Sequence, residues 1–197
     1  MSYRLRDSFY RRAKREGYRS RAAYKLLELN KSYRLIKFGD RVLDLGAAPG
    51  GWLQVASELV GPGGRVVGVD CQSIAPLEKE NVDLLQGDVL QEDTQNQIRQ
   101  LLGGLADCVL SDLSPRLTGI HDADVYRSIE LARIAIGLAS TLLRAGGNCV
   151  VKTFIGKETE AFFTELKPLF ASLQRTRAEA TRKHSSELYL IGKGFRP

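Results

Sequence analysis

The sequence is poor in the residues that build disulfide frameworks and metal sites, with three cysteines and two histidines in 197 residues. Cys71, Cys108 and Cys149 are widely spaced and odd in number, and the last two lie within apolar, strand-like runs. We therefore expect free thiols in a reducing compartment rather than a disulfide scaffold. His121 and His184 have no partner at metal-ligand spacing, so we predict no metal.

Long hydrophobic runs are also missing. The longest apolar helical candidate, residues 131–143, is interrupted by Arg133, so we expect no membrane partner. The basic N-terminus resembles an organelle transit peptide, but it lacks an apolar h-region and runs into what looks like the folded domain by Ser20, so a cytoplasmic protein is the simpler interpretation. A chain of 197 residues can bury a full core, and we predict one domain over residues 1–197, acting as a monomer.

Positive charge is concentrated at the N-terminus. Residues 1–25 hold nine basic side chains against two acidic ones, a net charge of +7; because the whole chain carries +6, residues 26–197 sum to −1. Aromatic residues are interleaved with these cations, which suits phosphate contacts beside stacked bases. A solvated helix face is the alternative. We predict a nucleic-acid-binding arm at about residues 1–25, with candidate contacts at Arg11, Arg12, Lys14, Arg15, Arg19 and Arg21.

A glycine-rich turn at residues 44–51, DLGAAPGG, joins an apolar run at 42–45 to a helix-like run that begins at Trp52. Glycines at positions 46, 50 and 51 let a ligand approach the backbone closely. A second strand at 65–69 leads to Asp70, which is placed to bind a ribose diol. This is the pattern of a nucleotide-binding half of an open parallel sheet, although a turn that uses glycine for geometry alone is the bland alternative.

The spacing of the glycines disfavours a dinucleotide. The G-x-G-x-x-G pattern of pyrophosphate sites is absent, and Asp44 precedes Gly46. A carboxylate there repels a pyrophosphate and suits a cationic ligand such as S-adenosylmethionine. A nicotinamide oxidoreductase is therefore disfavoured.

Strand-like and helix-like segments alternate along the chain, which predicts an α/β fold with a mostly parallel sheet covered by helices on both faces. Further strands are expected at residues 82–86, 106–111, 148–153, about 172–177 and 188–192. Apolar stripes predict helices beyond Ser20, a candidate cap, and over residues 125–143 and 162–169. Ligands bind at the carboxyl ends of such strands. The polar residues expected there are Asp44, Asp70, Asp88, Asp112 and Lys152.

Asp112 and Lys152 each end an apolar strand, where a charge is costly unless it is paired or used. For either residue alone, a structural cap or ion pair is as good an interpretation as catalysis. Their occurrence at adjacent strand ends beside a nucleoside site favours catalysis.

Four segments together resemble the FtsJ/RrmJ family of S-adenosylmethionine-dependent RNA ribose 2′-O-methyltransferases. They are EGYRSRAAYKL at 16–26, DLGAAPGGW at 44–52, QGD at 86–88 and SSELY at 185–189. The resemblance implies a Rossmann-like class I methyltransferase fold with seven strands. It also implies a catalytic set at Lys25, Asp112, Lys152 and Glu187, and cofactor contacts from Asp44, Gly46, Gly50, Gly51, Trp52, Asp70, Asp88 and Asp112.

In that set Lys152 is our general base. A lysine side chain ordinarily has a pKa of about 10.4, so the pKa of Lys152 must be lowered for its neutral amine to accept a proton. A neighbouring cation such as Lys25, the cofactor sulfonium or desolvation would lower it. Asp112 and Glu187 are expected to hold the two ammonium groups. The sequence leaves open that Lys152 only orients the hydroxyl while proton loss lags methyl transfer.

The resemblance also suggests a substrate. The single-domain build and the SRAAYK segment are similar to enzymes that methylate a uridine in the A-loop of large-subunit ribosomal RNA. An alternative substrate is a nucleotide of the transfer RNA anticodon loop. An alternative role is that of a cofactor-binding ribosome-assembly factor with incidental catalysis. Where the family often has Pro-Asn after its catalytic-strand Asp, this chain has Pro115-Arg116, so Arg116 is a candidate phosphate contact.

Overall fold

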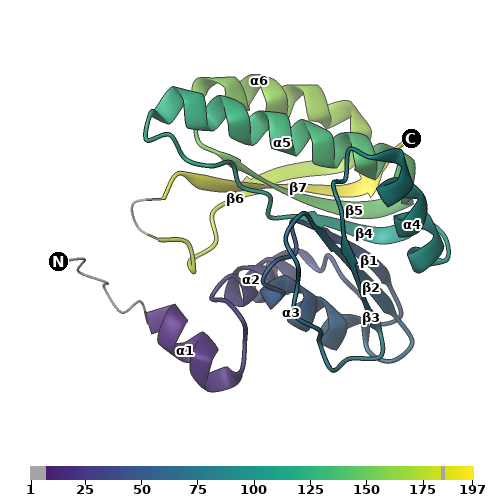
Figure 1. The fold of residues 1–197 in the computed structure, drawn as a ribbon. Helices are drawn as coiled ribbons and strands as arrows, with labels where there is room; N and C mark the ends of the chain where they lie inside the picture. The colour runs from purple at the N-terminus through teal and green to yellow at the C-terminus, as the bar shows by residue number, and fades with distance from the viewer. Residues whose placement is uncertain (1–7, 183–184) are drawn as a thin grey trace.

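The computed structural model describes residues 8–182 and 185–197, and its centre is one seven-stranded sheet in the order β3-β2-β1-β4-β5-β7-β6 (Figure 1). Strands β1 to β5 are parallel to one another, whereas β7 is antiparallel to both β5 and β6. The strands are β1 Arg41–Leu45, β2 Arg65–Asp70, β3 Val82–Gln86, β4 Ala106–Ser111, β5 Leu143–Phe154, β6 Phe170–Thr176 and β7 Glu187–Phe195.

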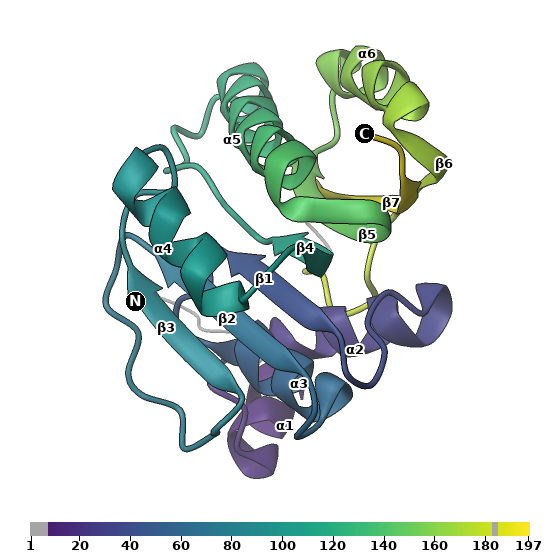
Figure 2. The ribbon, with the colours of Figure 1, turned by 90° about the vertical axis from the view of Figure 1, so that its right-hand side faces the viewer.

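Helices cover both faces of this sheet (Figure 2). One buried cluster joins the sheet to α2 and α3, and a second joins its other face to α4, α5 and α6. The predicted α/β architecture is therefore confirmed. The helices are α1 Ser8–Glu16, α2 Ala23–Tyr33, α3 Gly51–Val60, α4 Glu92–Leu102, α5 His121–Leu142 and α6 Lys157–Leu166, followed by the 3₁₀ turn Lys167–Leu169.

The expected strands match the observed ones within a few residues, except at the start of β5. This strand begins at Leu143, five residues before the predicted start at 148. The pairing register with β4 shifts between the Ala106 and Cys108 pairs, so residues 144–147 form an irregularity within the strand. Glycines at positions 146 and 147 are typical of the end of a helix. The sequence therefore did not indicate that β5 already begins at Leu143.

Ser20 does not cap α2. The helix begins at Ala23, its N-cap residue is Ala22, and no side-chain capping bond forms. The Ser20 hydroxyl instead faces Gly51, where a Cβ atom would lie 2.3 Å from Oγ. Gly51 thus allows the segment before α2 to pack against the start of α3.

The described part of the N-terminal arm forms a docked helix. Ala13 of α1 is buried together with Tyr24 and Ala180, and the Tyr24 hydroxyl donates to Glu16 at 2.8 Å. Arg4 and Arg6 of the predicted arm lie outside the described residues. In Figure 1, helix α1, the first residues of β7 and the first residues of α5 lie toward the same ends of the strands.

Candidate active site

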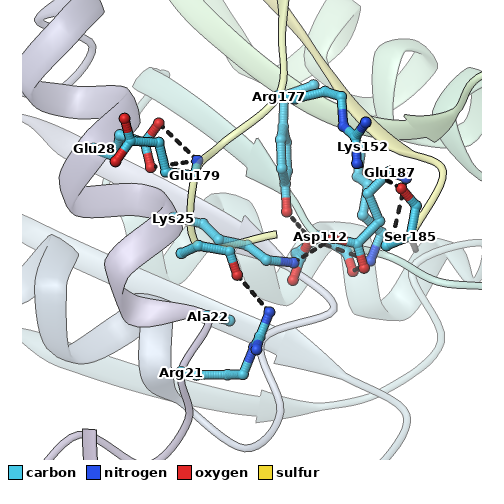
Figure 3. Close-up of polar contacts among 12 residues, drawn as sticks. Arg21, Ala22, Lys25, Glu28, Asp112, Lys152, Arg177, Glu179, Ser185 and Glu187 are labelled. Atoms are coloured by element: carbon cyan, nitrogen blue, oxygen red, sulfur yellow. Dashed lines mark hydrogen bonds and ion pairs between the residues drawn. The ribbon is translucent and has the colours of Figure 1, made fainter. Parts of the chain in front are cut away.

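Two lysine–carboxylate pairs form the centre of the site (Figure 3). Lys25 Nζ on α2 lies 2.5 Å from Oε2 of Glu187 at the start of β7. Lys152 Nζ on β5 lies 3.1 Å from Oδ1 of Asp112 and donates to the Asp112 backbone carbonyl at 2.7 Å. The structure thus brings together four residues that the sequence spreads from position 25 to position 187, and it pairs each lysine with its own carboxylate.

The two lysines are buried while their partners reach the surface. Lys25 and Lys152 are each 6% exposed. The side chains of Glu187 and Asp112 are 22% and 20% exposed. A buried ammonium group needs a close partner, and here each has one. The two ion pairs hold both Nζ atoms at fixed points just beneath the surface.

Tyr189 connects the two pairs and was missed by the sequence analysis. Its hydroxyl donates to Asp112 Oδ1 at 2.8 Å, and its ring centroid lies 5.8 Å from Lys25 Nζ. Burial and the neighbouring Asp112 and Glu187 carboxylates raise the pKa of Tyr189. Because strand side chains alternate between faces, its position two residues after Glu187 was the available signal.

Asp44 is the most unusual polar group in the site. It is fully buried in β1, and neither carboxylate oxygen has a hydrogen-bond partner among the residues that the structure describes. Burial, followed by the charges of Asp112 and Asp70, raises the pKa of Asp44 well above its ordinary value. An unpaired buried carboxylate of this kind fits a cationic ligand, and contact of Asp44 with the cofactor stays a prediction.

The loop between β1 and α3 is bound to the end of β2. The backbone amides of Gly46 and Ala47 both donate to the Val69 carbonyl, at 2.9 and 3.1 Å. Gly46 has φ of +77°, and a Cβ there would lie 2.8 Å from Leu113 Cδ2. Only glycine fits this position without a local shift. Gly50 likewise has φ of +105° and is the N-cap of α3.

Asp70 belongs to the same loop network. Its Oδ2 accepts a bond from Ala48 N at 3.0 Å and its Oδ1 accepts one from Gln72 N at 2.8 Å. Both oxygens keep further lone pairs, because each carboxylate oxygen can accept two bonds. Asp88 is exposed just beyond β3, where its Oδ1 accepts a bond from Leu90 N. Contacts of Asp70 with a ribose and of Asp88 with an adenine stay predictions.

Trp52 and Arg19 have structural partners that the sequence did not reveal. The Trp52 indole is 3% exposed, donates to the Ala22 carbonyl at 2.8 Å and packs on Tyr189. The Arg19 guanidinium donates to the carbonyls of Pro49, Ala75 and Pro76. Trp52 thus packs beneath the loop, and the Arg19 side chain lies across it. Contacts of Trp52 with the cofactor and of Arg19 with RNA stay predictions.

The remaining residues that are predicted to contact RNA differ in their exposure and in their bonds to other groups of the protein. Arg11, Arg12, Lys14 and Arg15 are exposed on α1, although Arg12 also bonds Glu16 at 2.8 Å and lies over the Tyr24 ring. Arg21 donates to the Ala180 carbonyl, and burial together with Arg182 lowers its pKa. Arg116 is exposed in the loop after β4. Their contacts with RNA stay predictions.

Over residues 8–182 and 185–197, His, Cys, Asp and Glu form no group of three that could hold a metal. His184 lies outside this range. Within the same residues, no helix has the length and apolar character needed to cross a membrane.

The strand order, the loop over an unpaired aspartate and the lysine–carboxylate pairs together define an S-adenosylmethionine-dependent methyltransferase. Comparison with known families agrees: residues 18–195 match the model described as FtsJ-like methyltransferase. The chain belongs to this family and is an RNA methyltransferase that uses S-adenosylmethionine.

Named relatives are similar along nearly the whole chain. "Ribosomal RNA large subunit methyltransferase E" of Archaeoglobus fulgidus is 50% identical over 190 residues, covering 96% of both chains. The protein of the same name from Methanothrix thermoacetophila is 50% identical over 188 residues, covering 95% of this chain and 72% of the relative.

Solved structures share the fold. A Plasmodium falciparum protein described as a ribosomal RNA methyltransferase has a TM-score of 0.79 at 29% identity, covering 90% of this chain and 98% of its own. Fibrillarin from Aeropyrum pernix, solved with natively bound S-adenosyl-L-methionine, has a TM-score of 0.61 at 20% identity. It covers 89% of this chain and 75% of its own, and it supports the fold alone.

Proposed function

We propose that this enzyme methylates the ribose 2′-oxygen of large-subunit ribosomal RNA, with a uridine of the A-loop as the target. The reaction type is inferred from two buried lysines, each paired with its own carboxylate. They lie at the end of the sheet that also holds Asp44. The names of the archaeal relatives support ribosomal RNA as the substrate.

The cofactor supplies a methyl group on a cationic sulfur. Asp44 is placed to pair with its positive charge, and Gly46 and Gly50 let it approach the backbone. Asp70 would hold the ribose hydroxyls and Asp88 the adenine. All of these residues follow or end the parallel strands β1, β2 and β3, where ligands of open α/β sheets bind.

Methyl transfer needs an aligned nucleophile and a destination for its proton. The bound cofactor would supply an electrophilic methyl carbon to the ribose 2′-oxygen, and the electron pair of the broken carbon–sulfur bond would remain on sulfur. Lys152 Nζ, as the neutral amine, takes the 2′-proton. Its two contacts with Asp112 fix the direction of Nζ, while the Lys25–Glu187 pair places a second cation on the other side of Tyr189.

The test is single-turnover transfer from methyl-labelled cofactor to total RNA, isolated ribosomal subunits and transfer RNA, with the modified nucleotide mapped. Label on the 2′-oxygen of a large-subunit nucleotide is the expected result. Label confined to transfer RNA would identify the alternative substrate. Label on a base rather than a ribose would refute the reaction type.

Substitution of Lys152 separates catalysis from assembly. Lys152→Ala should slow transfer by about 10²–10⁴-fold, the usual contribution of a positioned proton acceptor. Lys152→Arg should be nearly as slow, because guanidinium stays protonated. Lys31→Ala, an exposed lysine on the last turn of α2, is the matched control. Full turnover by Lys152→Arg would mean that Lys152 only orients the hydroxyl. Full subunit maturation with Lys152→Ala would favour the assembly-factor role.

A further inference from the structure

Three large apolar side chains are exposed where the chain leaves β4 and enters α5. Leu117 is 68% exposed, Ile120 is 66% and Tyr126 is 60%. Single exposed apolar residues are common on protein surfaces, whereas a group of three within ten residues of one segment is a candidate interaction surface. We refer to Leu117, Ile120 and Tyr126 as the apolar platform.

The segment that carries the platform is fixed at both ends. At its start, Leu113 packs against Gly46, and the Asp112 carbonyl accepts a bond from Lys152. At its end, the Asp124 carboxylate accepts bonds from Thr118 N at 2.7 Å, Thr118 Oγ1 at 2.7 Å and Gly119 N at 3.2 Å. Leu117 and Ile120 therefore lie on an ordered turn, and Tyr126 lies on the helix that follows it.

The platform is close in sequence to the reacting groups. Leu117 is five residues beyond Asp112, and the second turn of α5 is linked to this segment by a 3.4 Å bond from Arg127 to the Arg116 carbonyl. In Figure 1 the start of α5 and helix α1 lie toward the same edge of the sheet but on opposite sides of it. An RNA strand that reaches the catalytic lysines would have α1 on one side and the platform on the other.

The surroundings favour a nucleobase as the occupant. Arg116 and Arg127, both exposed, flank the platform with positive charge. A nucleotide whose 2′-hydroxyl enters a buried pair of lysines must be unpaired, so its neighbours lose stacking partners. Exposed bases of this kind bind aromatic and apolar side chains, with arginines on the phosphates.

We propose that Leu117, Ile120 and Tyr126 bind an unpaired nucleobase next to the target ribose, with Arg116 and Arg127 on the flanking phosphates. This inference rests on the proposed function, because it assumes an RNA substrate at the lysine pairs. It adds a specificity: the substrate must present at least one unstacked base beside the methylated nucleotide.

The test is binding and single-turnover methylation of protein-free large-subunit RNA. Tyr126→Ala combined with Leu117→Ser should raise KM for RNA by about tenfold, the scale of one lost stacking contact, with little change in kcat. Cofactor affinity and the salt slope of binding should stay unchanged, because the lost contacts are uncharged. Tyr126→Phe should keep wild-type binding. Leu105→Ser, which removes an exposed leucine just before β4, is the control.

A second pair of variants addresses the phosphates. Arg116→Gln with Arg127→Gln should reduce the log–log salt slope by about 1.4 units, or 0.7 for each single-strand contact. An unchanged KM for protein-free RNA with the Tyr126→Ala/Leu117→Ser variant would overturn the proposal. A loss seen only with intact subunits would assign the platform to a ribosomal protein and overturn it too. If the wild-type enzyme binds RNA through the platform but methylates no ribose, the proposed function fails instead.

Discussion

The Tyr189 hydroxyl donates to the same Asp112 oxygen, Oδ1, that lies 3.1 Å from Lys152 Nζ. Strand pairing produces this arrangement, because Tyr189 is the register partner of Lys152 across β5 and β7. The tyrosine ring also packs between Trp52 and Lys25. One buried side chain thus touches both ion pairs and the packing beneath the cofactor loop.

Tyr189→Phe should keep the ring contacts and remove only the hydroxyl. We expect single-turnover transfer to fall by about tenfold, since a hydrogen bond to a charged group contributes about 1.5–3 kcal/mol and part of it is replaced by water. KM for RNA and cofactor affinity should change little. Unchanged transfer would show that Lys152 alone holds Asp112 in place.

Asp44→Asn should weaken cofactor binding and stabilise the cofactor-free enzyme. The variant loses a charge that pairs with the cationic ligand, and we expect affinity to fall by about 10–100-fold. It also removes a buried carboxylate that has no hydrogen-bond partner among the described residues and whose ionised form destabilises the fold. Calorimetric titration and chemical denaturation at pH 7 measure the two effects. A cofactor-free variant less stable than wild type would contradict the assignment.

The stabilisation by Asp44→Asn should depend on pH. The folded-state pKa of Asp44 is raised above the unfolded value of about 3.9, so the folded protein binds more protons between these two values. The raised pKa of Asp44 therefore makes its full contribution to folding stability below the unfolded-state pKa. That contribution is lost as pH rises through the folded-state pKa. The difference between variant and wild type should shrink as pH is lowered. Over the same range, cofactor binding to wild type should tighten as pH rises and Asp44 ionises.

The α1 cations should act on RNA in two different ways. Arg11→Gln, Lys14→Gln and Arg15→Gln together should reduce the salt slope of RNA binding by about 2–3 units if each side chain meets one phosphate. Arg12→Gln should instead loosen α1, because Arg12 bonds Glu16 and lies over Tyr24. Proteolysis within α1 would report that loosening. A slope unchanged in the triple variant would mean a solvated helix face.

Thiol labelling should distinguish the three cysteines. Cys71 is exposed, whereas Cys108 and Cys149 are buried on adjacent strands. Burial raises the pKa of Cys149 to about 12 and also raises that of Cys108. A native enzyme should therefore react once with a thiol reagent at pH 8, and three times after denaturation. Rapid native labelling of Cys149 would show that the sheet opens locally.

Periodicity and strand-end residues are local patterns, and they predicted the sheet, its helical layers and the positions of Asp112 and Lys152 at strand ends. Lys25 and Glu187 were implied by the family resemblance, and the catalytic roles of all four residues stay predictions. The sequence did not predict how the charges pair. The Lys25–Glu187 contact depends on the antiparallel register of β7 with β5, which follows from the fold as a whole. The partners of Arg19 and Trp52 were not predictable for a similar reason. They are backbone carbonyls of Ala75, Pro76 and Ala22, and because every residue has a carbonyl, the sequence does not indicate which one a side chain will contact.

The packing of residues 17–22 under the cofactor loop determines how the N-terminus can be engineered. Gln54 accepts a bond from Arg19 N and donates to the Gly17 carbonyl, while Ser20 fills the space that Gly51 leaves. Truncation tolerance follows the burial and hydrogen bonding of the removed backbone. We expect a deletion that stops before Gly17 to keep cofactor binding and, if α1 binds RNA as predicted, to weaken RNA binding. A deletion that continues past Ser20 would remove the contacts that support the cofactor loop. We therefore expect cofactor binding and RNA binding to depend on neighbouring segments that meet within a few residues.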